Sequence, residues 1–421
     1  MNHTDQAFNA IAILLSFAAI ASYVNHRFIR FPQTIALMAL SLSLSLIVVF
    51  LGTVEFIDPI LIKDTVASLH FDEVLLHGLL AYLLFAGALH IKFELLRGVL
   101  GQIITLATIS VLTSGLIAGG LFWYIANLLG FQVGFIHGLL FGTLIAPTDP
   151  VAVLGILKRA GAPKTLETTM AGESLFNDGV GVVIFLTVAS VAFTGTDPVL
   201  ADVGAFLLLE VGGGVLLGAA LGWLAYLLMR PIDDHSVEVL LSLALVSGGY
   251  ALAIALHISG PIVVVVAGII VGNKARSMAM SEVTRDYLDN FWELIDDILN
   301  AVLFAFVGLE VVAIHLDWDY ALVGILAIPA VILARLISIS IPGITFHFIG
   351  LVPFDRNVLA ALTWGGLRGG ISVALALSLP DSPERDLLVT ASYIVVVFSV
   401  LVQGLTFGRL VQRLFPRYIP D

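Results

Sequence analysis

The sequence predicts an all-α polytopic membrane protein, and composition and hydropathy pattern carry this prediction. Hydrophobic residues make up 59% of the 421 residues, charged residues only 12%, and the mean hydropathy is +1.06. No water-soluble core needs so large an apolar fraction. Apolar stretches of about 20 residues, the length that crosses a bilayer as a helix, also follow one another almost from end to end. The membrane is therefore the expected solvent.

Charges, glycines and prolines divide the chain into about thirteen spans. These lie at about 7–24, 32–51, 71–91, 100–127, 131–156, 165–194, 200–229, 236–257, 259–273, 290–314, 319–342, 355–379 and 386–413. We expect residues 52–70 to form an exposed loop or an interfacial segment. The first span should be retained, because residues 1–10 lack the basic region and cleavage site of a signal peptide. Residues 1–421 are thus predicted to form one transmembrane unit without a soluble domain.

Basic residues predict the orientation of these spans. Most of the 19 Lys and Arg residues are assigned to the loops after odd-numbered spans, namely Arg27, Arg30, Lys92, Arg97, Lys158, Arg159, Lys164, Arg230, Lys274, Arg276, Arg285 and Arg356, and the tail adds Arg409, Arg413 and Arg417. Cytoplasmic loops of membrane proteins collect Lys and Arg. We therefore expect the C-terminus to be cytoplasmic and the N-terminus to lie outside.

Two arginines fall inside predicted spans, and three acids inside other spans are available as their partners. Arg335 and Arg368 lie in the eleventh and twelfth spans, Asp149 in the fifth, and Glu173 and Asp178 in the sixth. A charge at bilayer depth costs several kcal/mol and persists only with a partner or beside a water-filled cavity. These residues are the main functional candidates.

The sixth span carries two polar stripes. Ser174 and Asp178 are four residues apart and share one helix face, while Glu173 and Asn177 share the adjacent face. One stripe can turn a carboxylate and a hydroxyl toward an ion path. The other can send a carboxylate toward an arginine on a neighbouring helix.

Two spans should be interrupted near their middle. Pro147 and Pro150, on either side of Thr148 and Asp149, remove backbone donors and should unwind the fifth span. In the twelfth span, LTWGGLRGGISVAL, glycines flank Arg368. Broken spans at corresponding positions of two halves point to a mid-membrane binding site in an inverted-repeat transporter. Freed carbonyls could coordinate a cation, and Asp149 and Arg368 could offset the partial charges of the half-helix ends.

These motifs resemble those of the sodium/proton exchangers of the bacterial NhaP and animal NHE type, in the branch with an Asn-Asp pair. The similarity covers nearly the whole chain and rests on TDPVAV at 148–153, GESLFND at 172–178, LAR at 333–335 and GLRGGISVALALSLP at 366–380. The resemblance implies a homodimer in the plasma (inner) membrane, with an elevator type of alternating access. Residues of about 71–194 and 290–413 would contribute the ion-binding core bundle, and about 7–51 and 200–273 the dimerisation part.

The resemblance also implies an ion-binding set. Asp178 matches the carboxylate that binds either the cation or a proton, and Asn177 matches the amide before it. Ser174 and the backbone around Thr148 match cation-binding positions, and Asp149 matches the aspartate at the unwound crossing. Transported Na⁺ or Li⁺ would thus bind at Asp178, Ser174 and Thr148.

Further matches concern fixed charges and stoichiometry. Glu173 matches a structural acid expected to pair with Arg335, and Arg368 matches the arginine of the glycine-rich crossing. An amide followed by an acid, Asn177 then Asp178, implies electroneutral one-for-one exchange, since electrogenic relatives carry two adjacent aspartates. Competition of proton and cation for one carboxylate predicts a steep pH dependence.

Three alternatives compete with this interpretation. A cation channel would usually show a symmetric filter built from repeated subunits, whereas here the charges are distributed through one chain in two unlike half-sites. An intramembrane enzyme with Ser174 as nucleophile would need a base in reach, and no mid-span histidine supplies one. Potassium/proton exchange stays open, because cation choice depends on site size and ligand geometry. Asp296 and Asp297 are interpreted as an interfacial cap in preference to a wet cytoplasmic entrance.

The sequence indicates few other binding partners. Cysteine is absent, which excludes disulfides and thiolate metal sites. No cofactor, nucleic acid or obligatory protein partner is indicated beyond membrane lipids and a second copy of the chain.

Overall fold

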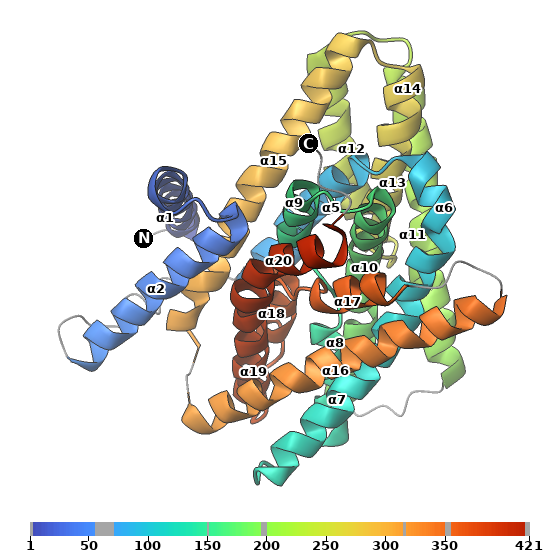
Figure 1. Ribbon diagram of the computed structural model, residues 1–421. Coiled ribbons are helices and arrows are strands. Elements are labelled where there is room, and N and C mark those ends of the chain that lie inside the picture. Colours follow the sequence, from blue (N-terminus) through green and yellow to red (C-terminus); the bar gives the residue numbers. More distant parts are fainter. Residues whose placement is uncertain are drawn as a thin grey trace.

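The protein is a bundle of helices that cross one another at steep angles (Figure 1). The computed structural model describes residues 3–54, 71–149, 151–194, 200–314, 317–349 and 355–416, and these contain no β-strand. Most of the predicted loop at 52–70 lies outside the described residues.

The helices follow the predicted apolar stretches along the chain. The first half forms, with η for short π-helical or 3-10 turns, α1 (His3–Val24), η1 (Asn25–Ile29), α2 (Gln33–Thr53), α4 (Phe71–Val74), η2 (Leu75–Leu79), α5 (Leu80–Leu89), α6 (Phe93–Thr105), η3 (Leu106–Ser110), α7 (Val111–Leu128), α8 (Phe135–Ile145), α9 (Val151–Ala160) and α10 (Lys164–Thr194). The second half forms α11 (Leu200–Met229), α12 (His235–Ala255), α13 (Gly260–Ile270), η4 (Val271–Ala275), α14 (Arg276–Met278), α15 (Glu282–Leu309), η5 (Glu310–Val312), α16 (Trp318–Ile349), α17 (Arg356–Trp364), α18 (Gly370–Leu377), α19 (Arg385–Phe398), η6 (Ser399–Gln403) and α20 (Gly404–Leu414).

The outer surface of the bundle suits a lipid solvent. Within the described residues, 8 helices are long and apolar enough to cross a membrane. Large apolar side chains face outward, among them Leu208 at 76% and Leu216 at 74% exposure. A helix satisfies its own backbone, which the bilayer core requires. The all-helical membrane fold is therefore confirmed, while the count of thirteen spans stays a prediction.

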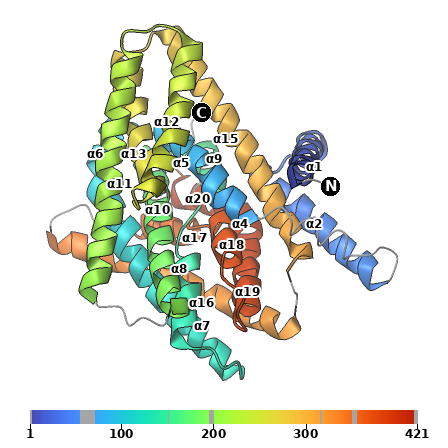
Figure 2. The ribbon, with the colours of Figure 1, turned by 180° about the vertical axis from the view of Figure 1, so that it is seen from behind.

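Both predicted interruptions are present. α8 ends at Ile145 and α9 begins at Val151, while α17 ends at Trp364 and α18 begins at Gly370. The two breaks touch, because the backbone N–H of Asp149 donates to the carbonyl of Leu367 at 2.8 Å. α8, α10, α17 and α18 lie near the middle of the bundle in both views (Figures 1 and 2).

Glycines set the position of the first broken helix. Gly119 on α7 faces Gly138 on α8, and Gly115 faces Gly142 one turn further along. A Cβ on Gly119 would lie 2.6 Å from the Gly138 carbonyl oxygen, so the two backbones are in direct contact. Small residues that allow such close approach are the usual glue between membrane helices. This contact fixes the end of α8 beside the break.

The remaining helices pack in two groups around α15. Trp292 of α15 is buried against Phe85 of α5, with ring centroids 4.7 Å apart, in an apolar cluster that includes α11, α12 and α13. The other face of α15 contacts α1 and α2, as Figure 1 shows. A second apolar cluster joins α7 to α10 with α16 to α20, and it also includes residues of α1, α2 and the C-terminal half of α15. α5 and α15, which the sequence assigned to the core bundle, thus pack mainly on helices assigned to the dimerisation part.

Candidate ion-binding site

Asp178 lies at the buried end of a large cavity. The side chain on α10 is 4% exposed, and its Oδ1 has no hydrogen-bond partner among the described residues. The cavity, of about 600 Å³, is also lined by Asp149. Exposed residues line its other end, including Lys158 and Arg159 at the end of α9 and Glu293 on α15. The site is thus open toward the side of the molecule that carries the basic loops.

A network of neutral polar groups stands next to Asp178. Thr148 Oγ1 and Ser174 Oγ are 3.0 Å apart, and Asn177 Nδ2 donates to Thr148 Oγ1 at 2.8 Å. The backbone N–H of Thr148 donates to Asn177 Oδ1 at 3.3 Å. Both ends of the Asn177 amide are therefore used to hold the unwound segment against α10. Ser174 and Asp178 lie one helical turn apart, as their spacing predicted.

Asp149 stands at the start of α9, where the chain resumes its helix. Its Oδ1 accepts a hydrogen bond from the backbone N–H of Val151 at 2.9 Å. A carboxylate in this position satisfies a free backbone donor and the positive end of the helix. A Cβ at Gly369 would overlap the Asp149 carboxylate, so the second break must carry glycine there.

Arg368 serves the opposite half-helix end. Its guanidinium is 2% exposed and donates to the carbonyls of Ala146 and Pro147, the latter at 3.0 Å. These carbonyls have lost their helical partners, because α8 ends at Ile145. The arginine therefore neutralises the negative end of α8, while Asp149 offsets the positive end of α9.

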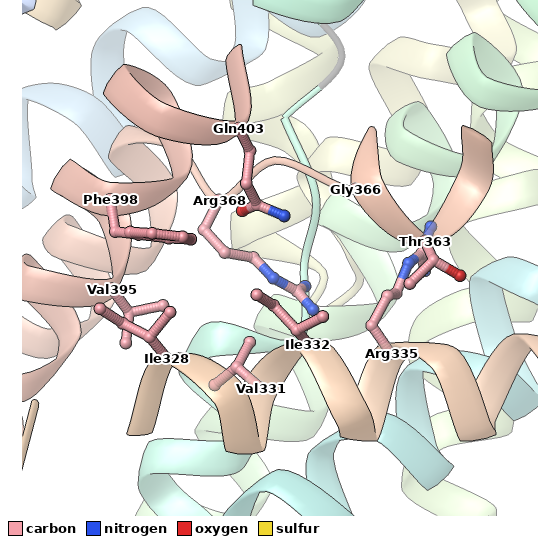
Figure 3. A pocket seen from close by; sticks show the side chains of 10 residues that line it. All are labelled: Ile328, Val331, Ile332, Arg335, Thr363, Gly366, Arg368, Val395, Phe398 and Gln403. Carbon is pink, nitrogen blue, oxygen red and sulfur yellow. The ribbon is translucent and has the colours of Figure 1, made fainter. Parts of the chain in front are cut away.

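The link between α17 and α18 is held by hydrogen bonds from the last span, which comprises α19, η6 and α20. The backbone N–H of Arg368 donates to Ser399 Oγ at 2.9 Å, and Ser399 Oγ donates to Gln403 Oε1 at 2.7 Å. Ser399 and Gln403 belong to the π-helical segment η6, a backbone form often found at functional sites. Figure 3 shows Gln403 directed toward Arg368 over a small cavity of about 10 Å³.

Glu173 and Arg335 form a buried ion pair between α10 and α16. Arg335 Nη1 lies 2.5 Å from Glu173 Oε1, and their side chains are 3% and 1% exposed. Arg335 also donates to the carbonyl of Leu362 on α17 at 3.4 Å. Figure 3 shows Arg335 rising from α16 beside Gly366, while Arg368 enters the same region from the link. The pair holds three helices together.

Three polar residues of α15 also belong to the site. The sequence did not predict a role for Asn300, and it assigned Asp296 and Asp297 a different one. Asp296, Asp297 and Asn300 line the cavity with Asp149 and Asp178. α15 begins at Glu282, so Asp296 and Asp297 lie inside the helix and do not cap its start, and their place on the cavity wall favours the alternative of a wet entrance. Asn300 is 3% exposed and lies one helical turn after Asp296 on the same face of α15. The four-residue spacing of Asp296 and Asn300 within an apolar stretch was the available signal.

Comparison with known proteins agrees with this geometry. The model of the family described as "Sodium/hydrogen exchanger, transmembrane" matches residues 13–413. The chain is 48% identical over 414 residues to the Na⁺/H⁺ antiporter NhaP of Pseudomonas aeruginosa, covering 96% of each chain. It is 33% identical to the Na⁺/H⁺ antiporter NhaH of Halobacillus dabanensis, again covering 96% of each. These relatives are named as transporters, not as enzymes.

The fold is also that of a solved antiporter. The sodium proton antiporter MjNhaP1 of Methanocaldococcus jannaschii superimposes with a TM-score of 0.76, covering 98% of this chain and 99% of the other at 20% identity. The architecture is thus shared although most residues differ. With the family model matching nearly the whole chain, the protein belongs to the sodium/hydrogen exchanger family.

Proposed function

We propose that the chain is a secondary transporter that exchanges Na⁺, and also Li⁺, for H⁺ in a one-for-one, electroneutral cycle. The observation that carries the proposal is the buried, unpartnered oxygen of Asp178 at the end of a cavity that reaches the surface. A carboxylate in this position must gain either a proton or a cation, because a bare buried charge is costly. The relatives named as Na⁺/H⁺ antiporters support the choice of cargo.

The cation is proposed to bind oxygen atoms of Asp178, Ser174 and Thr148. Hard cations such as Na⁺ take carboxylate, hydroxyl and carbonyl oxygens as ligands. The hydroxyls of Ser174 and Thr148 are already 3.0 Å apart, which keeps two neutral oxygens together on the α10 side of the break. Asn177 acts here as a positioning residue, because its amide holds Thr148.

Electroneutrality follows from the number of free charges. Glu173 is paired with Arg335, and Asp149 and Arg368 each serve a half-helix end. Of Asp149, Glu173 and Asp178, only Asp178 is then left to change its charge, and Asn177 before it is an amide. A site loaded with either H⁺ or Na⁺ carries the same net charge, and only the empty site must move a bare carboxylate through the membrane.

Movement of the site is proposed to be of elevator type within a homodimer in the plasma (inner) membrane. α7 packs on α8 and α16, α16 on α19, and α6 on α10, whereas α5 packs mainly on α13 and α15 mainly on α2. This packing favours a mobile bundle of α6 to α10 and α16 to α20 against a scaffold that includes α5 and α15. With the N-terminus outside and the C-terminus cytoplasmic, the cavity beside Lys158 and Arg159 opens toward the cytoplasm.

The experiment is a proteoliposome assay with an imposed proton gradient and a pH-sensitive dye inside. Na⁺ or Li⁺ should drive proton movement in the wild type and not in Asp178→Asn. Asp286→Asn is the matched control, because it makes the same change at an exposed position of α15. Rates should not change when the membrane potential is clamped at different values.

Other outcomes would change the proposal. A response to K⁺ alone would make the chain a potassium/proton exchanger. Cation flux without proton movement would make it a channel. A rate that follows the membrane potential would contradict electroneutral exchange.

A further inference from the structure

A second large cavity, away from the ion site, lies between α16, α17 and α20. Its volume is about 650 Å³. Its lining includes Leu336, Arg356, Trp364, Thr406, Arg409 and Arg413, and we call it the arginine pocket. Figure 1 shows α17 beside α20, with α16 crossing below them. No acidic side chain is among the residues that line it.

Two hydrogen bonds define how α17 and α20 run past each other. Asn357 Nδ2, at the start of α17, donates to the carbonyl of Leu414 at the end of α20, at 3.1 Å. Trp364 Nε1, at the end of α17, donates to Thr406 Oγ1 near the start of α20, at 2.9 Å. The two helices are therefore antiparallel, and the cavity follows the groove beside them.

This arrangement gathers three arginines at one end of the groove. Arg356 precedes Asn357 and Arg413 precedes Leu414, so the two arginines come from the ends that the hydrogen bond joins. Arg409 lies one helical turn before Arg413 on the same face of α20. The opposite end of the pocket has the aromatic ring of Trp364.

The three guanidinium groups are free to bind an anion. All three arginines are exposed, and none forms an ion pair with another described residue; the ion pairs that are present involve other side chains. Asp355, the neighbouring acid at the start of α17, is itself exposed. Arginine matches phosphate geometry through its planar donors, and the N-terminal end of α17 adds a positive partial charge.

The surroundings of the pocket fit a lipid better than a soluble anion. Val402 and Leu405, which precede Arg409 on the same face of the last span, are 43% and 42% exposed. Leu333 and Leu336 on α16 are 47% and 40% exposed. Exposed apolar side chains thus continue along the bundle surface from the arginines, so that acyl chains could contact them while the headgroup contacts the arginines. The arginines belong to the predicted cytoplasmic side, where anionic lipids contact basic pockets between helices.

We propose that the arginine pocket binds the phosphate of an anionic phospholipid, whose acyl chains lie along α16 and the last span. The bound lipid would touch three helices that surround the second break, because α16 carries Arg335 and α17 leads into the link with Arg368. It would therefore hold α16, α17 and α20 against one another next to the ion site. This site is distinct from the cavity of Asp178 and does not depend on which cation is transported.

The test measures lipid binding to the purified full-length chain in a neutral detergent, by native mass spectrometry. The probes are phosphatidylglycerol, which has a net negative charge, and phosphatidylcholine, which has the same phosphate but no net charge. Each arginine near a membrane surface contributes about a fivefold factor in affinity for an anionic lipid. The variant Arg356→Gln/Arg409→Gln/Arg413→Gln should bind phosphatidylglycerol on the order of 100-fold more weakly.

The matched control is Arg27→Gln/Arg97→Gln/Arg230→Gln, which removes three exposed arginines of the same predicted side from other helices. It should bind like the wild type. If the triple pocket variant is not monodisperse, Arg409→Gln alone should still weaken binding about fivefold. Equal losses in pocket and control variants, or equal affinity for the two lipids, would overturn the proposal. Equally tight binding of glycerol phosphate would identify a soluble-anion site instead. Sodium-driven transport is measured in a separate assay, so that the lipid site and the proposed Na⁺/H⁺ exchange can each fail without affecting the test of the other.

Discussion

Removing one partner of the Glu173–Arg335 ion pair should destabilise the protein far more than removing both. Both side chains are almost fully buried, and the two charged atoms are 2.5 Å apart. Glu173→Gln removes the countercharge of the Arg335 guanidinium and leaves it only neutral acceptors, such as the Leu362 carbonyl at 3.4 Å. An uncompensated buried charge of this kind costs about 3–5 kcal/mol.

The double variant Glu173→Gln/Arg335→Met removes both charges and keeps similar side-chain volumes. Replacement of a buried pair by neutral groups is often close to neutral in stability, so its loss should stay within about 1 kcal/mol. The surface pair of Lys164 and Glu167 on the same helix is the control, because the Lys164 side chain is 74% exposed. Lys164→Gln should cost no more than about 0.5 kcal/mol.

The assay is equilibrium unfolding of the purified protein in mixed micelles, followed by circular dichroism, with thermal melts as a second readout. The expected order is wild type, Lys164→Gln and the double variant close together, with Glu173→Gln well below them. A double variant as unstable as the single one would refute the reasoning, since it would show that the side chains matter through packing and not through compensation of charge.

Three further predictions concern transport. Because proton and sodium compete for one carboxylate, the apparent KM for sodium should rise by about tenfold per unit fall in pH on the acid side. The transport rate at saturating sodium should change little. KM values that do not change with pH would exclude competition. Asp296→Asn removes a negative charge from the cavity wall. The KM for sodium should therefore rise a few-fold at low ionic strength, and the difference from the wild type should disappear in concentrated choline chloride. A fall in kcat alone would argue against a role of Asp296 in attracting the cation. Gly369→Ala places a Cβ against the Asp149 carboxylate and should cost about 1–3 kcal/mol and most of the transport rate, whereas Gly98→Ala, with nothing within 4 Å, should behave as wild type in both assays.

Local chemistry explains why much of the fold could be predicted. The apolar stretches predict helices because a bilayer offers no partners to an unpaired backbone. Pro147 and Pro150 predict an interruption because they remove donors within the segment itself, and the chain is indeed unwound from Ala146 to Asp149. The two polar faces of α10 follow from helical periodicity. Each of these inferences uses neighbours within a few residues.

Other features of the site depend on contacts between distant segments. Glu173 and Arg335 are 162 positions apart, and no spacing rule joins them; only resemblance to a family implied the pair. The Asn177 amide holds Thr148 of the unwound segment, 29 positions away, a contact that no spacing rule predicts; its place among the ion-binding residues stays a prediction. The spacing of Asp296 and Asn300 places both on one face of a helix, but only the fold shows that this face lines the cavity of Asp178.

By itself, the sequence determined the solvent of the protein, the helical class, the two interruptions and the charged residues that had to matter, because these depend on local hydropathy and backbone chemistry. Only the tertiary structure decided which half-helix end each charge serves, where the cavity reaches Asp178, and which arginines meet at the surface. Those features arise where helices cross, and the partners of a buried charge or cavity wall are chosen by packing across the whole chain.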